Sequence, residues 1–582
     1  MSVTRKGRRI IAGVAAGTML VGALTAATTS SASAASKSGG TLIYVTLADQ
    51  FDHVDPTRVY TGRDIAFLNT YLYRTLVSYK YVTGDAGFQI TPDIATNTGV
   101  PSNQAKTWSF TLRSGVKWED GTPVTCQDFK YGLSRSFAQD VLPDGPTYSI
   151  QYLDIPQNAD GSSKYPGPYK ATAAQQAMYD KAVSCNGNTI TYRLNKSVAD
   201  FNFFATYPAM SPVRQAKDNG EKYDTRPLAT GPYKIKQYKI GDSLTLVRNP
   251  NWSAKTDPIR TPYPDSVEVR FGIASAVIDQ MMKTDSIPNA ISFDGLLAQD
   301  VPGFFTNPDT AKRGMLVMDP YTRYFGINAT TINCLTARKA LFFAWDTKGI
   351  IDANGGETYY GVAGDNYIKP NLGADYSVTK GNIHDANWKP NGNPAYAKQL
   401  LDQAKTECPA VYKKITSDGI SLDLPNTPTY KAWTPSISAA MKAAGIVLNF
   451  NFIPSGQYYS TVQNPAKQGD ITRAGWGPDW ANASTVIPPL LTKNGGFDLG
   501  QTWSDTAAYA KLNTLIDKAF AETNRAKQSL VWHDAAQFAM DQYWGLGFMF
   551  PKQADAFGSG VGGVQWWGPQ GTFLFGKMYL KQ

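Results

Sequence analysis

Apolar and polar residues alternate in several short stretches of the first half of the chain, a pattern typical of half-buried β-strands. Trp108, Phe110 and Leu112 alternate along residues 107–113. The same spacing of two recurs at residues 190–194, 244–246 and 267–271. We therefore predict a strand in each of these four stretches.

In the second half, apolar residues recur at helical spacing. One apolar face predicts a single helix from Ala337 through Trp345 to about Ile351. A second helix follows the capping pair Asn393-Pro394, and a third occupies residues 512–520. Another helix is predicted from about Pro435 to a stop at Gly445, followed directly by an alternating strand over 446–452. Helices and strands in close succession indicate an α/β protein.

The first 35 residues have the layout of a cleaved secretory signal. Four basic residues between Arg5 and Arg9 precede an apolar stretch from Ile10 to about Leu24, and small residues end at Ala34 and Ala35. The stretch contains glycines and is short for a membrane span, so a retained anchor is the lesser interpretation. The pair Arg8-Arg9 leaves both the general secretory and the twin-arginine route open. The sequence predicts export.

Composition narrows the class of protein further. The formal net charge is +9 over 582 residues, and four of the basic residues lie in the leader. The remaining Lys and Arg are dispersed, without the basic stripe that nucleic-acid binding needs, so we expect no nucleic-acid partner. A chain of this length requires two or three domains. Its 13 Trp and 32 Tyr fit either large cores or a ligand cleft lined by rings.

The sequence contains few of the residues and motifs that are typical of an enzyme active site. His53, His384 and His533 are the only histidines, they are far apart, and none belongs to a metal-binding motif. No nucleophile elbow or phosphate loop is present. The glycine-rich run 558–563 lacks a following helix, and 158–161 lacks the later acidic ligand of a calcium loop. We expect no catalytic residues, no metal and no cofactor.

The sequence contains four cysteines, at positions 126, 185, 334 and 408. An even number in an exported protein favours disulfides, and the spacing excludes CxxC motifs. Three pairings are possible, and the sequence alone does not choose between them.

One set of motifs does point to a family. Residues 108–129 read WSFTLRSGVKWEDGTPVTCQDF, a strand and two turns leading into a helix whose first turn contains Asp128. Further motifs lie in the same order as in that family: Gly40-Thr41-Leu42, Val54-Asp55-Pro56, TGPYK at 230–234, VRNPNW at 247–252, ARKALFFAWD at 337–346 and RAGWGPDW at 473–480. Together they resemble the extracellular solute-binding proteins of peptide and nickel ABC importers (family 5). The resemblance covers nearly all of the chain after the leader.

The resemblance implies a periplasmic-binding-protein-like α/β fold (class II type, cluster C). Two lobes would close on a ligand, with an extra α+β domain beside lobe one and a two-stranded hinge. It places lobe one at residues 37–72, 225–320 and 551–582, the extra domain at 74–224 and lobe two at 321–550. With these boundaries, Cys126 would pair with Cys185 and Cys334 with Cys408, because each pair then lies within one domain.

The resemblance also implies a site. In peptide binders of the family, the Asp matched by Asp479 binds the ligand's α-ammonium group; alternatively, Asp479 caps a helix starting near Trp480 or Ala481. Arg473 matches a position that can meet a peptide carboxylate, or it is a surface or interlobe salt-bridge residue. The remaining candidates would line the ligand. Trp476 would be a pocket wall or, alternatively, a buried core Trp, and the backbone of Gly475 and Gly477 could pair with a peptide as an added strand. From lobe one, Tyr60 and Gly62 match a segment that lies along the ligand.

The resemblance implies a non-enzymatic solute-binding component of an ABC importer that captures a short peptide. An oligosaccharide carrier of the same family is the alternative, because stacked rings also bind sugars, and a secreted hydrolase is the distant one. The partners would be a membrane permease with its ATPase, and the protein a monomer. Relatives often carry a lipid-anchored cysteine, but here Leu24-Thr25-Ala26-Ala27 occupies that run. We therefore expect an unanchored protein in the periplasm, the cell envelope or the medium.

Overall fold

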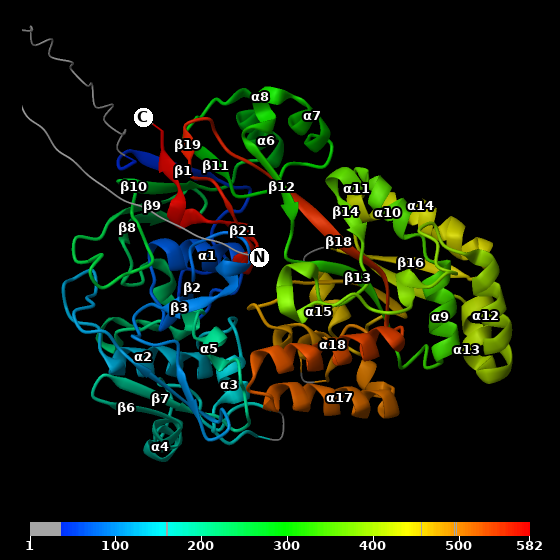
Figure 1. The fold of residues 1–582 in the computed structure, drawn as a ribbon, viewed down its shortest axis with the longest axis horizontal. Helices are drawn as coiled ribbons and strands as arrows, with labels where there is room; N and C mark the ends of the chain where they lie inside the picture. Colours follow the sequence, from blue (N-terminus) through cyan, green and yellow to red (C-terminus); the bar gives the residue numbers. More distant parts are fainter. Residues whose placement is uncertain (1–36, 159–160, 455–456, 494, 496, 582) are drawn as a thin grey trace, which may run out of the picture. The chain divides into compact units, whose positions relative to one another are not determined.

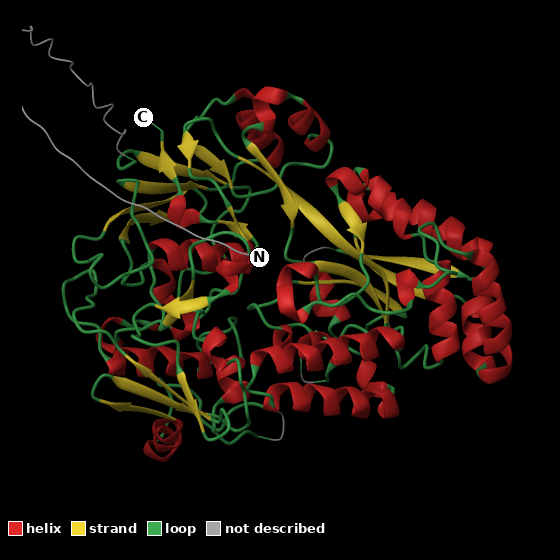
Figure 2. Ribbon diagram, viewed as in Figure 1, coloured by secondary structure: helices red, strands yellow, loops and turns green. Residues whose placement is uncertain are grey.

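The computed structural model describes residues 37–581 apart from 159–160, 455–456, 494 and 496. The predicted signal peptide lies outside the described residues. Figures 1 and 2 show strands gathered into several sheets with helices around them. Across the described residues, no helix combines the length and apolar character needed to cross a bilayer.

The first sheet has five strands around a parallel centre. Strand β1 runs parallel to both of its neighbours, β10 and β11. Its alternate residues enter two separate cores: Ile43 and Val45 pack with helices α6 and α7, whereas Leu42 and Tyr44 pack with α1. In sheet order the strands are β11 (Ala290–Ser292), β1 (Thr41–Val45), β10 (Ser266–Arg270), β9 (Ser243–Arg248) and β8 (Tyr233–Lys239). The helices are α1 (Gly62–Tyr71), α6 (Ser275–Thr284), α7 (Val301–Thr306) and α8 (Pro308–Ala311).

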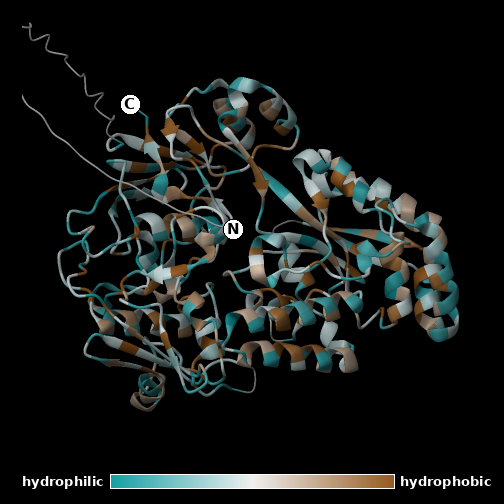
Figure 3. Ribbon diagram, viewed as in Figure 1, coloured by the Kyte–Doolittle hydropathy of each residue, from teal (hydrophilic) through white to brown (hydrophobic). Residues whose placement is uncertain are grey.

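The second sheet has seven strands. Its order is β12 (Gly314–Met318), β18 (Gly545–Ala556), β13 (Thr322–Ile327), β17 (Ile471–Trp476), β15 (Ile420–Pro425) and β16 (Leu448–Ile453), with β14 (Gly361–Ala363) also on β18. Strand β15 is parallel to both neighbours, and the other pairs are antiparallel. Its helices are α9 (Leu335–Ala344), α10 (Thr347–Ala353), α11 (Gly356–Tyr359), α12 (Pro394–Glu407), α13 (Pro409–Lys413), α14 (Pro428–Ala443), α15 (Tyr458–Val462), α16 (Ile487–Leu491), α17 (Thr506–Ala521) and α18 (Arg525–Asp541). In Figure 3, α12 carries both hydrophilic and hydrophobic residues, in agreement with its single buried face.

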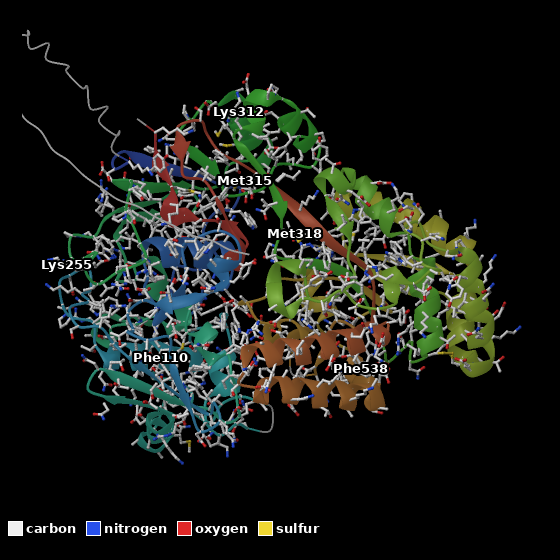
Figure 4. The ribbon with its side chains drawn as sticks, viewed as in Figure 1. Phe110, Lys255, Lys312, Met315, Met318 and Phe538 are labelled. Carbon is white, nitrogen blue, oxygen red and sulfur yellow. A yellow bond between two sulfur atoms is a disulfide. The ribbon has the colours of Figure 1, made fainter. Side chains whose placement is uncertain are left out.

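A two-stranded ribbon connects these two sheets. The first part of β18 pairs with β13, and its end, from Lys552 to Ala556, pairs with β12. Beyond that end, Phe557 bridges to Ile291 of the first sheet. Figure 4 labels Met315 and Met318 on β12, where every residue is half-buried. Strand β12 is therefore only partly covered, whereas Ala554, Asp555 and Ala556 of β18 are buried.

The third sheet carries the longest family motif. Its strands, in sheet order, are β4 (Val100–Ser102), β5 (Thr107–Thr111), β7 (Thr189–Arg193) and β6 (Val183–Asn186). Separate from it are three two-stranded sheets: β2 (Val77–Tyr79) with β3 (Ile90–Pro92), β19 (Val561–Gly562) with β22 (Tyr579–Leu580), and β20 (Trp566–Trp567) with β21 (Thr572–Phe573). Beside it lie α2 (Cys126–Ser134), α3 (Tyr148–Tyr152), α4 (Ala173–Ala182) and α5 (Phe201–Phe204). Thr125 and Asp128 cap α2 reciprocally. The motif thus specifies a scaffold.

Both predicted disulfides are present. Cys126, at the start of α2, is joined to Cys185 on β6. Cys334, before α9, is joined to Cys408 at the end of α12. The predicted pairing is confirmed, and each bridge fixes a helix end to a neighbouring element.

A buried ion cluster ties the Val54-Asp55-Pro56 turn to the residues after α2. Both terminal nitrogens of Arg135 donate to the Asp55 carboxylate at 2.7 Å, and Nε donates to Asp218 at 3.0 Å. The Arg135 and Asp55 side chains are fully buried. The turn is therefore held by a bidentate ion pair.

Two helix predictions were wrong. The helix expected over 337–351 ends at Ala344, because Asp346 accepts a hydrogen bond from the Gly349 amide at 2.7 Å and so caps a new helix, α10. The helix expected from Pro435 begins at Pro428, where Thr427 supplies the cap, and Pro435 lies inside it. The four strands predicted in the first half and the helix after Asn393 are confirmed.

Candidate functional site

A cavity of about 250 Å³ brings together six of the seven candidate residues. They come from the start of α1 and from the end of β17 with its following loop. The six are Tyr60, Gly62, Gly475, Trp476, Gly477 and Asp479, and the rings around them are Phe88, Tyr207, Tyr321, Tyr459 and Phe497. A second cavity, of about 390 Å³, lies beside the Cys126–Cys185 disulfide and contains none of the candidates.

Asp479 is a partly buried carboxylate that receives tyrosine hydroxyls. The Tyr60 hydroxyl donates to Oδ2 at 2.8 Å, and the Tyr148 hydroxyl donates to the same oxygen. Burial raises the pKa of Asp479 to about 6, although the hydroxyls of Tyr148, Tyr60 and Tyr207 act in the opposite direction. No Lys, Arg or His nitrogen of the described residues lies within 4.0 Å of it. The carboxylate is thus solvated by neutral donors and suited to a cation brought by a ligand.

The alternative role of Asp479 as a helix cap is wrong. The next helical turn, Ala483–Thr485, is capped by Asn482, whose side chain accepts from the Ser484 amide. The Asp479 amide instead donates to the Thr485 hydroxyl at 3.1 Å. That bond fixes the loop and leaves the Asp479 carboxylate free to face the cavity.

The loop after Asp479 is anchored to residues far away in the sequence. The indole N–H of buried Trp480 donates to Asp200 at 2.9 Å, and the Ser484 hydroxyl donates to the same carboxylate oxygen. Trp480 also packs against the Tyr148 ring, with 4.5 Å between centroids. Residues that sequence analysis did not select therefore position Asp479. Residues 142–171 are rich in Gly, Pro, Asp and Tyr, and this composition is the signal by which the sequence could have pointed to Tyr148.

Arg473 lies on β17 next to the cavity lining. Only 8% of the residue is exposed, its guanidinium lies 5.3 Å from the Tyr430 ring centre, and Nη1 donates to the Tyr459 hydroxyl at 3.4 Å. Its Nε is buried without a hydrogen-bond partner, and no described carboxylate lies within 4.0 Å. The alternative of a surface or interlobe salt bridge is therefore wrong.

The other candidates form the wall and an open strand edge. Trp476 is half-buried, stacks obliquely on Phe497 at 5.0 Å and donates to the Thr485 carbonyl, so it is a cavity wall and not a core residue. Strand β17 pairs with β13 along its whole length but with β15 only at Ile471 and Thr472. From Arg473 to Trp476, no described strand covers the second edge.

Comparison with known proteins gives consistent matches. The model of a family described as "Bacterial extracellular solute-binding proteins, family 5 Middle" matches residues 89–498. The periplasmic oligopeptide-binding protein OppA of Escherichia coli (strain K12) is 26% identical over 463 residues, 75% of each chain. Heme-binding protein A of Haemophilus influenzae is 22% identical over 538 residues, 88% of each chain.

The solved structures match over nearly the whole chain. The clavulanic acid biosynthesis oligopeptide binding protein 2 has a TM-score of 0.84 and 25% identity, covering 94% of this chain and 96% of that one. These matches confirm the predicted two-lobed α/β fold.

Proposed function

Because the chain belongs to the bacterial extracellular solute-binding proteins of family 5, we propose that it captures short peptides between its two lobes. It would then deliver them to a membrane permease and ATPase of an ABC importer. The observation that carries the peptide assignment is the Asp479 carboxylate, which faces the cavity with tyrosine hydroxyls around it and no cation of the described chain beside it. An α-ammonium group supplies the missing cation.

Each candidate residue has a role in this proposal. Asp479 binds the ammonium group, and Arg473, whose Nε has no partner, binds a carboxylate of the same ligand. The uncovered edge of β17 at Gly475, with Gly477 just after the strand, pairs with the peptide backbone as an added strand, which reads length but not sequence. Trp476, Tyr60 and Gly62 form walls of the cavity.

The proposal includes the predicted domain division. Lobe one would comprise residues 37–72, 225–320 and 551–582, the extra domain 74–224, and lobe two 321–550. The β12–β18 ribbon, which carries the chain between the first two sheets, supports a hinge near Tyr321 and Phe550. The relatives named as periplasmic support an extracytoplasmic location. Action as a monomer is part of the proposal.

Binding is tested by calorimetry and tryptophan fluorescence with di- to pentapeptides and their N-acetylated forms. We expect the free peptides to bind and the acetylated ones to bind at least about tenfold more weakly, because acetylation removes the ammonium charge. Binding of cello- or chito-oligosaccharides without any peptide would favour the oligosaccharide alternative. Release of cleaved products from labelled peptides or glycans would favour the hydrolase.

The affinity should also depend on pH. Asp479 must be ionised to pair with an ammonium group, and its pKa in the free protein is raised by burial to about 6. Below that pH the affinity should therefore fall by about tenfold per pH unit, and it should level off near pH 7, before the peptide α-ammonium begins to deprotonate near its own pKa of about 8. Calorimetry between pH 4.5 and 8 measures this; an unchanged affinity across that range would contradict the role of Asp479.

A further inference from the structure

A second arginine lies beside Arg473, on the neighbouring strand β13. Arg323 on β13 is paired in register with Gly475. A Cβ atom on Gly475 would lie 2.8 Å from Nη1 of Arg323 and 3.6 Å from Nη2 of Arg473. The missing side chain of Gly475, which itself lines the cavity, thus leaves two guanidinium groups as neighbours.

The charge of these two arginines is only partly compensated. Arg473 has no carboxylate within 4.0 Å among the described residues, and Arg323 has only Asp319, at 3.6 Å. Asp319 is already engaged, since the Lys369 ammonium lies 2.8 Å from its Oδ1 and the Tyr321 amide donates to the same oxygen. Arg323 and Lys369 therefore share one carboxylate and Arg473 has none within reach, so the excess charge is positive.

Aromatic rings hold both guanidinium groups in place. Arg323 lies 4.6 Å from the ring centre of Tyr321, and Arg473 lies 5.3 Å from that of Tyr430. The Arg323 side chain is 27% exposed, so it can be reached from solvent. Planar guanidinium groups held in this way recognise carboxylates through paired hydrogen bonds.

We propose that Arg323 and Arg473 together form a subsite for two carboxylates, which makes the protein selective for short peptides that end in an acidic residue. The inference rests on the proposed function, because Asp479 and Arg473 first bind the two peptide termini. Arg473 takes the α-carboxylate and Arg323 takes the side-chain carboxylate of the same residue. Asp and Glu hold two carboxylates a few bonds apart, which fits two neighbouring guanidinium groups.

The test compares Ala-Ala-Glu with its neutral isostere Ala-Ala-Gln, and Ala-Ala-Asp with Ala-Ala-Asn, by calorimetry. In the wild type we expect the acidic peptide of each pair to bind roughly tenfold more tightly, the size of one added charge-assisted hydrogen bond. Arg323→Gln should reduce the ratio to about one and leave Ala-Ala-Ala binding within about threefold of wild type. Arg323→Lys, which keeps the charge but not the fork, should retain part of the preference.

Arg248→Gln is the matched control, because it removes the same charge from a position that is 40% exposed and lies in the first sheet. It should leave the ratio unchanged. Wild-type binding of all peptides with a ratio near one, or a preference that survives Arg323→Gln, would overturn this inference while the peptide-binding function stands. Failure of the wild type to bind any peptide would overturn both.

Discussion

Replacing Asp479 by asparagine should weaken the binding of short peptides by roughly 100-fold or more, because losing one member of a desolvated ion pair costs about 2–5 kcal/mol. Asparagine has nearly the same shape and can still accept the Tyr60 and Tyr148 hydroxyls, so the cavity keeps its walls. Only the negative charge is lost. Calorimetry with a free peptide measures the effect.

Two controls accompany this variant: a peptide without an ammonium group and a substitution at the protein surface. An N-acetylated peptide has no ammonium group, so it should bind wild type and Asp479→Asn with similar affinity. Asp265→Asn, at an exposed side chain, should behave as wild type toward both peptides. Equal affinity of Asp479→Asn and wild type for the free peptide would remove Asp479 from the site.

The same substitution should not destabilise the empty protein. Because the folded-state pKa of Asp479 is raised to about 6, its favourable contribution to stability is complete only below the ordinary Asp pKa and is lost as the pH rises through 6. At pH 8 the wild type has lost that contribution, whereas neutral asparagine has no ionisation penalty. The ligand-free variant should therefore melt at the same temperature as wild type or higher, which separates lost affinity from lost folding.

Replacing Arg135 by methionine should have the largest effect on stability, lowering the free energy of unfolding by about 3–5 kcal/mol. The substitution leaves Asp55 and Asp218 buried without their cation. Thermal unfolding at neutral pH should show a clear downward shift of the lowest transition. Arg248→Met is the control, since it breaks the pair with Asp265, whose two side chains are 40% and 66% exposed, and should cost less than about 1 kcal/mol. Equal shifts for both variants would contradict the argument.

Sequence patterns predicted the helices and strands whose ends and buried faces are marked by residues close together in the sequence. The helix after Asn393 has its cap, its proline and one apolar stripe in the sequence, and the structure begins it at Pro394. By contrast, α18 was not predicted, because its buried face begins with the polar Gln528 and Ser529 and continues largely with alanines, while the apolar Leu530 is exposed. The break after Ala344 depends on one side-chain bond, from the Gly349 amide to Asp346, that an apolar stripe does not reveal.

The site divides in the same way. Asp479, Arg473 and Trp476 belong to one continuous motif, so a family resemblance could select them. Tyr148, Asp200 and Arg323 come from separate elements and meet this motif only in the folded chain. No spacing within the sequence relates them to Asp479, and long-range packing alone determines their position.

The ribbon of β12 and β18 has a mechanical consequence. Two hydrogen-bonded strands resist sliding along each other but twist readily, so movement across the ribbon should be a rotation whose displacement grows with distance from it. Close to this axis, the Lys369 ammonium donates to the Pro551 carbonyl and pairs with the Asp319 carboxylate. Both contacts should persist during the rotation. The hydrogen bond from Trp480 to Asp200 lies far from this axis, so it should be among the first to break during the rotation.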